Sequence, residues 1–495
     1  MRNLLQAGSI VYHLLPGERL IQLREPLVKR CWLRHGAREC RDIKLANPPW
    51  RWLVVIAALP GLIAVFQLGR LHPDEVYQYL EPANWRAFGY GILAWEWQGA
   101  GLRNWAIPGI FALLLKACAA VGIDDPWKRR AVLELPQFAL HLWMLWAAWQ
   151  IALRRVPPEL ARWAIPLVGL YMPVLTFAGR TLGESFSASF LVIGLELIDR
   201  AKAGNATSWE IGNLRTRAAL AGGFVLGLAV VARYGSAAAV IGAMVWLLVR
   251  KRFSDFALAA AGGLVVALAL GALDWVTWGA PFHSLRAYLD FNVFSGKAAQ
   301  QFGSDPFTVY LPYLAMLAPW AWLGFLKRSS GVFNAAGLTY LVAIAITAHK
   351  EPRFIYPALV MLSVGVVAGA LELITKRGLA LTAVACLASL GFFFFDSQLK
   401  PERPEQFRLT ARAWPQATGY FLIPEGVWGA GGFFWLGKNL PWFTCDSPSD
   451  WRFQQSMGDP RFNRVVTFDS HGDAELLAAG FKLLEADGRA KLFGR

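Results

Sequence analysis

Long apolar runs alternate with short polar segments over most of the chain. Each run is near the length that a helix needs to cross roughly 30 Å of hydrocarbon. A buried helix of a large soluble protein can show one such run, whereas a series of about ten favours a membrane protein. We therefore expect an all-α polytopic membrane protein with about eleven transmembrane helices. The predicted spans are Trp52–Leu68, Ala131–Leu153, Trp163–Ala178, Leu182–Ile198, Ala218–Ala232, Ser236–Val249, Ala257–Leu273, Tyr310–Leu326, Gly331–Ala348, Ile355–Leu373 and Leu379–Phe395.

The basic residues between these runs predict the orientation of the chain. Clusters such as Arg250-Lys251-Arg252 and Lys327-Arg328 lie in short loops, and short basic loops stay on the cytoplasmic side. With the basic segment 1–49 inside, every cluster between spans falls inside if the apolar run Trp105–Val121 does not cross. We interpret that run as an interfacial or re-entrant helix. The net charge of +15 is then explained by topology, and we expect no nucleic-acid partner.

This orientation gathers a mixed set of His, Asp, Glu and Arg on the opposite, extracytoplasmic face. A transport path would place ionisable residues in the middle of the spans, and the spans are largely free of them. The outer segments are 72–75, 180–184, 233–235, the loop Asp274–Thr308 and 349–353.

Residues 396–495 have a different character from the apolar region. Strand-like runs occur at Gly419–Ile423 and Val465–Phe468, and Ala474–Ala479 is typical of a helix start. We predict a basic cytoplasmic segment at 1–49, a transmembrane domain at 50–395 whose first extracytoplasmic loop is 70–130, and a small extracytoplasmic α/β domain at 396–495.

Two adjacent carboxylates, Asp74 and Glu75, follow the first predicted span. In His72-Pro73-Asp74-Glu75 the proline and the acidic residues suit a first helical turn, so a capped interfacial helix is one interpretation. The other is chemical, because a carboxylate within hydrogen-bond reach of a hydroxyl can act as a general base. The aromatic loop that follows, Phe88 to Trp97, offers rings on which the CH-rich faces of sugars can pack.

The segment His349-Lys350-Glu351-Pro352-Arg353 brings three potential cations to the face where basic helix ends are sparse. Arg provides a fork of donors and Lys a point charge, which suits a phosphate or diphosphate, although a plain basic helix end is the alternative. Arg180 and Glu184 have the spacing of an ordinary intrahelical ion pair. The loop Asp274–Thr308 is too long for a simple connection and is interpreted as a lid or binding loop.

Other signals predict no chemistry of their own. The five Cys residues show neither zinc-ligand spacing nor a disulfide framework, and no His pair indicates a metal site. Asn205-Ala206-Thr207 is a glycosylation sequon, but the predicted topology places it inside, so we expect it to be unmodified.

Several rare strings occur in a specific order: 72–78, Phe88-Gly89-Tyr90-Gly91, Trp95-Glu96-Trp97, Leu102-Arg103, Arg180-Thr181, Glu184-Ser185, Asn292-Val293 and 349–354. Taken together, they resemble the glycosyltransferase family 22 enzymes. These are lipid-phosphate-mannose-dependent mannosyltransferases that build GPI anchors and N-glycan precursors. The resemblance runs from about Trp50 to Leu373 and implies a GT-C fold with its active site in the first extracytoplasmic loop. Gln98-Gly99-Ala100-Gly101 departs from the family, which often has a charged residue before Gly-x-Arg.

The same resemblance implies roles for individual residues in an inverting transfer. Asp74 would be the general base and Glu75 would orient the acceptor. Arg180, His349, Lys350 and Arg353 would bind the donor phosphate. The residues expected to bind acceptor or sugar are His72, Tyr77, Gln78, Trp95, Glu96, Trp97, Arg103, Glu184 and Asn292. We expect no cofactor and no metal.

The implied partners are a polyprenyl-phosphate sugar donor, a glycan or glycolipid acceptor, and the bilayer itself. Mannose follows from the resemblance alone, and a bacterial relative can use another hexose or a pentose. The Ala-, Arg- and Trp-rich composition favours a bacterial inner membrane over the endoplasmic reticulum, with the site facing the periplasm or lumen. The alternatives are a transporter or lipid-linked-sugar flippase, and a scaffold whose outer loops bind a partner.

Overall fold

A computed structural model describes residues 48–66, 72–201, 209–315, 319–325, 330–373, 403–424, 432–446 and 449–495. Residues 49–495 form one compact unit. Among the described residues, two helices, Phe253–Trp278 and Pro352–Leu373, are long and apolar enough to cross a membrane, and several shorter apolar helices accompany them. The number of crossings therefore stays a prediction. The span expected at Leu379–Phe395 and the segment 1–47 lie outside the described residues.

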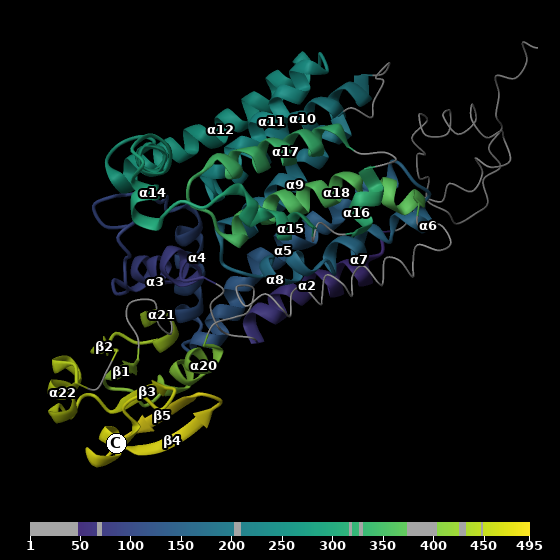
Figure 1. The fold of residues 1–495 in the computed structure, drawn as a ribbon. Helices are drawn as coiled ribbons and strands as arrows, with labels where there is room; N and C mark the ends of the chain where they lie inside the picture. Colours follow the sequence, from purple (N-terminus) through teal and green to yellow (C-terminus); the bar gives the residue numbers. More distant parts are fainter. Residues whose placement is uncertain are drawn as a thin grey trace, which may run out of the picture. The chain divides into compact units, whose positions relative to one another are not determined.

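Helix α9 lies at the centre of the helical part (Figure 1). Helix α9 packs against α5, α10 and α18, and α10 also packs along α12. Glycines permit this close approach: a methyl group on Gly223 of α10 would lie 1.9 Å from the Ala259 carbonyl oxygen of α12. The helices up to α12 are α2 (Trp50–Phe66), η2 (Glu75–Leu80), α3 (Glu81–Phe88), α4 (Ala106–Ala120), α5 (Pro126–Leu153), α6 (Pro158–Ala161), α7 (Ala164–Gly169), α8 (Met172–Phe177), α9 (Gly183–Ala201), α10 (Trp209–Ala232), η3 (Tyr234–Ser236), α11 (Ala237–Val249) and α12 (Phe253–Trp278).

The second half of the helical part is more interrupted. Helix α17 packs against α11 and α18, and α16 packs against α18. Its elements are α13 (His283–Leu289), η4 (Asp290–Phe294), α14 (Lys297–Phe302), η5 (Phe307–Tyr310), α15 (Leu311–Ala315), α16 (Pro319–Phe325), α17 (Gly331–Ile346), η6 (Pro352–Ile355) and α18 (Tyr356–Leu373).

Within the described residues, two predicted elements differ from the structure. Trp163–Ala178 is not one helix but two, α7 and α8, because the chain is extended at Tyr171 and Pro173 cannot donate the hydrogen bond that would continue α7. Within the predicted span Tyr310–Leu326 the structure describes the end of η5, α15 and α16, and residues 316–318 and 326 lie outside the described residues. Asp274 belongs to α12, which runs on to Trp278, so the outer loop begins later than expected and is itself largely helical.

Helix α5 carries buried polar residues, although the predicted spans were expected to be largely free of ionisable side chains. Glu134, Gln137 and His141 are all buried on this helix. His141 Nδ1 lies 3.1 Å from the Ala57 carbonyl oxygen, and Gln137 donates to the Arg180 carbonyl at 2.5 Å. The stripe connects α5 to α2 and to the start of α9.

The C-terminal part contains a five-stranded sheet of order β2-β1-β3-β5-β4 (Figure 1). β1 is parallel to β2 and β3, and β5 is antiparallel to β3 and β4. The strands predicted near residues 419–423 and 465–468 are confirmed as β1 and β3. The elements are α20 (Pro404–Ala413), β1 (Tyr420–Ile423), α21 (Gly432–Leu436), β2 (Trp442–Thr444), α22 (Trp451–Gly458), β3 (Arg464–Phe468), α23 (Asp473–Ala478), β4 (Lys482–Asp487) and β5 (Ala490–Gly494).

Buried Glu81 connects this C-terminal part to the first loop. Its carboxylate accepts a hydrogen bond from the Ile92 amide and another from the Phe434 amide, both at 2.6 Å. Side chains of η2 and α3 share one hydrophobic core with residues of α20, α21 and the sheet. The first loop is therefore held on one side by the helices and on the other by the C-terminal part.

Candidate active site

Local backbone geometry presents the two adjacent carboxylates at the start of a helix. Pro73 supplies a carbonyl that accepts hydrogen bonds from the amides of Val76 and Tyr77, and the Asp74 amide donates to His72 Nδ1 at 3.2 Å. The following segment, η2, is a single π-helical stretch that continues into α3. Such stretches are rare and occur often at functional sites.

Arg353 connects Asp74 to the segment 349–353. Its Nη2 lies 2.6 Å from Asp74 Oδ2, and its Nε lies 2.5 Å from Glu351 Oε2 and 3.6 Å from Glu184 Oε1. His72 lies between the same carboxylates, 3.2 Å from both Asp74 and Glu351. Charged residues from three separate parts of the sequence thus form one ion-pair network.

Two further arginines occupy the edge of this network. Arg233, at the end of α10, donates to Glu184, and its guanidinium lies over the Phe354 ring at 4.5 Å. Arg180 Nη1 lies 3.7 Å from Glu75 Oε2. The expected intrahelical pair of Arg180 with Glu184 is therefore wrong, because each residue is drawn to an opposite charge from another element.

The network keeps the carboxyl groups of Asp74 and Glu351 ionised. Burial would raise the pKa of Asp74, but the charges of Arg353 and His72 outweigh it and hold that pKa far below its usual range. Burial opposes ionisation of Glu351 in the same way, and Arg353 and His349 hold its pKa well below normal. Both groups are therefore anions at neutral pH.

The cations predicted to bind phosphate differ in how far their side chains are exposed to solvent. Lys350 Nζ donates to the carbonyl oxygens of Asp305 at 2.7 Å and Thr347 at 2.5 Å, with Ala348 at 3.4 Å, and the residue is 8% exposed. The Arg180 side chain is only 3% exposed. His349 lies 2.8 Å from Glu351 and its side chain is 25% exposed. The phosphate role of all four predicted cations stays a prediction.

The residues predicted to bind acceptor or sugar divide into four groups, the first being His72 and Glu184 in the ion-pair network described above. Glu96 accepts hydrogen bonds from Gln78 and Arg103, the latter at 2.6 Å. Trp95 lies against Phe291 and Phe302 of the outer loop, with ring centroids 5.1 and 6.3 Å away.

The last group consists of Trp97, Tyr77 and Asn292, whose described hydrogen bonds are to backbone carbonyls or whose side chains pack in the core. Trp97 is buried and donates its indole N–H to the Tyr77 carbonyl at 3.1 Å, and the Tyr77 side chain belongs to the hydrophobic core. Asn292 is exposed, and its amide donates to the Tyr288 carbonyl one helical turn back.

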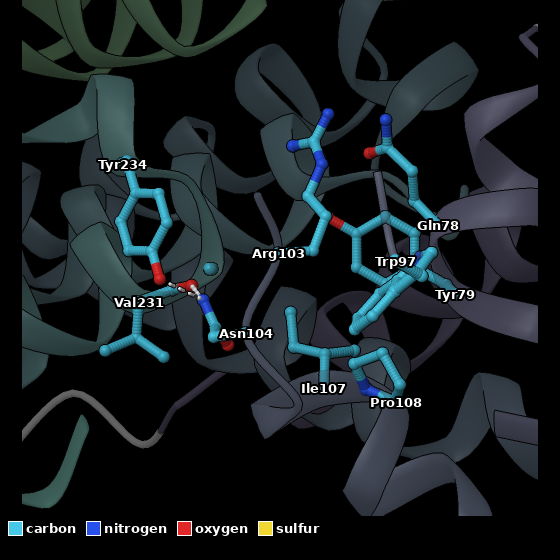
Figure 2. Close-up of a pocket in the computed structure, with 10 residues that line it drawn as sticks. Gln78, Tyr79, Trp97, Arg103, Asn104, Ile107, Pro108, Val231 and Tyr234 are labelled. Carbon is cyan, nitrogen blue, oxygen red and sulfur yellow. Dashed lines mark hydrogen bonds between the residues drawn. The ribbon is translucent and has the colours of Figure 1, made fainter. Parts of the chain in front are cut away.

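A small cavity opens beside Arg103, between the first loop and the end of α10 (Figure 2). Asn104 closes one side by donating to the Val231 carbonyl and the Tyr234 hydroxyl. Its lining residues are Gln78, Tyr79, Trp97, Arg103, Asn104, Ile107, Pro108, Val231, Ala232 and Tyr234.

Sequence reasoning did not single out Arg233, Glu351 or Tyr79 as site residues. The available signal for Arg233 was its place at an outer helix end, where basic residues are sparse. Glu351 was inside the recognised string but was passed over for the cations around it. Among the described residues, no group of three or more His, Cys, Asp and Glu side chains could hold a metal ion.

Comparison with known proteins identifies the family of the chain. The sequence profile of the Alg9-like mannosyltransferase family matches residues 51–397, which is more than half of the chain. The chain belongs to this family. The match includes every site residue described above, and it confirms the resemblance to family 22.

Relatives of this Alg9-like protein include GPI mannosyltransferases. GPI mannosyltransferase 3 of Yarrowia lipolytica is 32% identical over 62% of the chain and 59% of the relative. GPI mannosyltransferase 3 of Candida albicans is 26% identical over 57% of the chain and 56% of the relative. The chain thus spans little more than half the length of these relatives.

A solved structure supports the GT-C fold for this Alg9-like protein. ArnT from Cupriavidus metallidurans, bound to undecaprenyl phosphate, aligns with a TM-score of 0.56 at 14% identity. The alignment covers 90% of this chain and 98% of ArnT. At this level of identity the likeness concerns the fold alone.

Proposed function

We propose that the protein is an inverting membrane mannosyltransferase that takes mannose from a polyprenyl-phosphate donor. The acceptor is a glycan or glycolipid on the extracytoplasmic face. The observation that carries this proposal is the contact between Asp74 and Arg353 at 2.6 Å, which joins a carboxylate suited to proton transfer with a cation suited to phosphate. Family membership supports the choice of reaction.

In the proposed reaction an acceptor hydroxyl oxygen attacks C1 of the mannose. The new C1–O bond forms on one face as the bond to the phosphate oxygen breaks on the other, which inverts the anomeric centre. Asp74 takes the hydroxyl proton, and polyprenyl phosphate leaves with the bonding electron pair. Glu75, on the next residue, orients the acceptor.

Arg353 has a double task in this reaction. While it contacts Asp74 it keeps that carboxylate ionised but weakly basic. As negative charge grows on the departing phosphate, Arg353 is drawn toward it, and Asp74 becomes a better base when the proton must be taken. Glu351 and Glu184 contact Nε of Arg353, and these contacts keep the guanidinium in the site while its other end moves toward the phosphate.

The aromatic residues beside the network supply a sugar platform. Trp95 and Phe302 are partly exposed, and Phe302 also lies 5.2 Å from the His349 ring. Sugar rings have apolar faces that pack on such surfaces, while Glu96 and Gln78 can hydrogen-bond their hydroxyls.

The proposed setting is a multi-span membrane domain with 70–130 on its outer side, and a bacterial inner membrane fits the composition best. A lipid-phosphate donor keeps its reacting group at the headgroup level. A base that closely follows a membrane helix lies near this depth. Asp74 immediately precedes η2, the element that comes after α2 in the chain.

The direct test incubates purified protein in lipid vesicles with radiolabelled polyprenyl-phosphate mannose and candidate GPI-type and N-glycan-type acceptors. We expect a labelled glycolipid whose new linkage has the anomeric configuration opposite to that of the donor. Transfer from a pentose donor with none from mannose would correct the sugar. Movement of the lipid-linked sugar across the vesicle without transfer would instead favour a flippase.

A further inference from the structure

The outer loop turns back along the end of α12 instead of leaving the helices. Gly279 ends α12 with a φ of +78°, and Phe282 also lies in the left-handed region, with a φ of +55°. After this turn the Phe282 ring packs on Gly271, where a methyl group would lie 2.8 Å from Phe282 Cζ. The Ser284 amide and hydroxyl donate to Asp274 Oδ2 at 2.9 and 2.6 Å. The start of α13 therefore lies beside the last two turns of α12.

Helix α12 indicates the depth of this contact in a membrane. The helix is long and apolar enough to cross a bilayer, and at a rise of about 1.5 Å per residue Gly271 lies only about 10 Å from Trp278 along the axis. In its last turn Trp275 is 65% exposed and Val276 is 82% exposed, and Trp is typical of the bilayer boundary. In the proposed orientation, α13 and the segment after it therefore lie at the outer surface of the membrane. The loop, labelled at α14, lies at one end of α12 in Figure 1.

The π-helical stretch η4, which follows α13, exposes apolar side chains at this level. None of its five residues is buried. Phe294 is 76% exposed and Val293 is 58% exposed, and they are adjacent in the chain. Large apolar side chains that are exposed together mark an interaction surface. Here the surface lies beside the exposed end of a membrane helix, so a bilayer is the partner that fits it.

Another side of the same loop faces the proposed site. The ring centroids of Phe291 and Phe302 lie 5.1 and 6.3 Å from that of Trp95. Phe302 also lies 5.2 Å from the His349 ring. The loop that exposes Phe294 thus completes the aromatic surface beside the ion-pair network.

We infer that Val293 and Phe294 insert into the outer leaflet of the bilayer, and that this lipid contact anchors the outer loop over Trp95. Lipid is the occupant because the apolar surface is next to the exposed apolar side chains at the end of α12. The insertion depends only on the orientation of the chain in the membrane. Its effect on mannosyl transfer rests on the proposed function.

A fluorescent probe at position 294 tests the lipid contact. It is attached through Phe294→Cys in full-length protein whose five native Cys residues are replaced by Ala. In vesicles without donor or acceptor, lipids with brominated acyl chains should quench most of the emission, as they should for a probe at Val276→Cys, and aqueous iodide should quench neither. Leu483→Cys is the matched control, because Leu483 is apolar and 50% exposed but belongs to β4 of the C-terminal part. A probe there should be quenched by iodide and not by the brominated lipid.

Two results of this experiment would contradict the inference. Quenching at position 294 by iodide and not by brominated lipid would place the side chain in water. Protection from both quenchers would show that a protein surface, such as a second copy of the chain, covers it. Both results would leave the proposed function intact, because no substrate is present.

Transfer kinetics in vesicles test the anchoring role. Burial of a Phe side chain in lipid favours the inserted loop by a factor of about 10 or more, so Phe294→Ser should lower kcat/KM for mannosyl transfer by about that factor. Phe294→Leu keeps an apolar side chain and should restore most of the wild-type value. Equal kcat/KM for the wild type and Phe294→Ser would overturn the anchoring role. Absence of any transfer by the wild type would instead overturn the proposed function.

Discussion

Arg353 holds the proposed site together because its guanidinium contacts carboxylates from three parts of the chain: Asp74, Glu184 and Glu351. Each contact with an opposite charge offsets part of the cost of burying these groups. Arg suits this arrangement because its planar guanidinium presents N–H donors in fixed directions to several carboxylates. The residue that sequence reasoning assigned to a phosphate is thus also a structural centre.

Lys350 provides a sharp test at the same scale. Lys350→Met removes the donor from backbone carbonyls at the end of α17 and in the outer loop, and we expect a loss of about 1 to 3 kcal/mol in the free energy of unfolding. Thermal unfolding of purified protein measures this. Lys297→Met, at an exposed lysine paired with Asp290, is the control and should change little. A stable Lys350→Met protein with a raised donor KM would show that the phosphate role is the right one.

The residue types of the site could be predicted from the sequence, but their pairing could not. His72, Asp74 and Arg353 are in strings that mark an outer face. Arg180 and Glu184 have the spacing of a local pair, and the structure separates them because Glu75 and Arg233 are nearer in space. Long-range ion pairs depend on how helices pack, which local spacing does not encode.

At the scale of elements, α21 determines how the C-terminal part meets the first loop. Gly432 has a φ of +59° in the left-handed region, and a methyl group there would lie 2.7 Å from the Glu81 carboxyl carbon. Gly432→Ala should therefore destabilise the protein by more than the roughly 1 to 2 kcal/mol of a left-handed alanine alone. Gly480→Ala is the matched control, because Gly480 also has a positive φ but no atom lies within 4 Å of the added group. Equal melting temperatures for the two variants would contradict the contact.

Element boundaries were predicted well where one apolar run makes one helix, as for α2, α9 and α11. The prediction failed between α7 and α8, since hydropathy counts Pro173 without its effect on the backbone. The polar stripe on α5 was also missed. His141 and Gln137 lie among apolar residues, and only the packed structure shows the carbonyl groups that they meet.

At the scale of the whole molecule, the raised pKa of Glu81 leads us to expect that the free energy of unfolding depends on pH. Burial, opposed by hydrogen bonds from backbone amides, raises its pKa from 4.5 to about 7. Between these values the folded protein keeps a proton that the unfolded chain has lost, so stability falls as pH rises through this window, by about 3 kcal/mol in total. We measure the unfolding midpoints of wild type and Glu81→Gln from pH 4.5 to 8. At the acid end the two midpoints should differ only by a constant offset. At higher pH their difference should change, because only the wild type loses the proton of Glu81. Glu475→Gln, an exposed site, should follow the wild type at every pH.

The central claim is that Asp74 is the base of a mannosyl transfer from a lipid phosphate. The most direct measurement is single-turnover transfer from polyprenyl-phosphate mannose in vesicles, comparing Asp74→Asn with Asp290→Asn at an exposed carboxylate of the outer loop. We predict a loss of about 10²- to 10⁴-fold for Asp74→Asn and near wild-type rates for Asp290→Asn. An Asp74→Asn rate within a few fold of wild type would contradict the account.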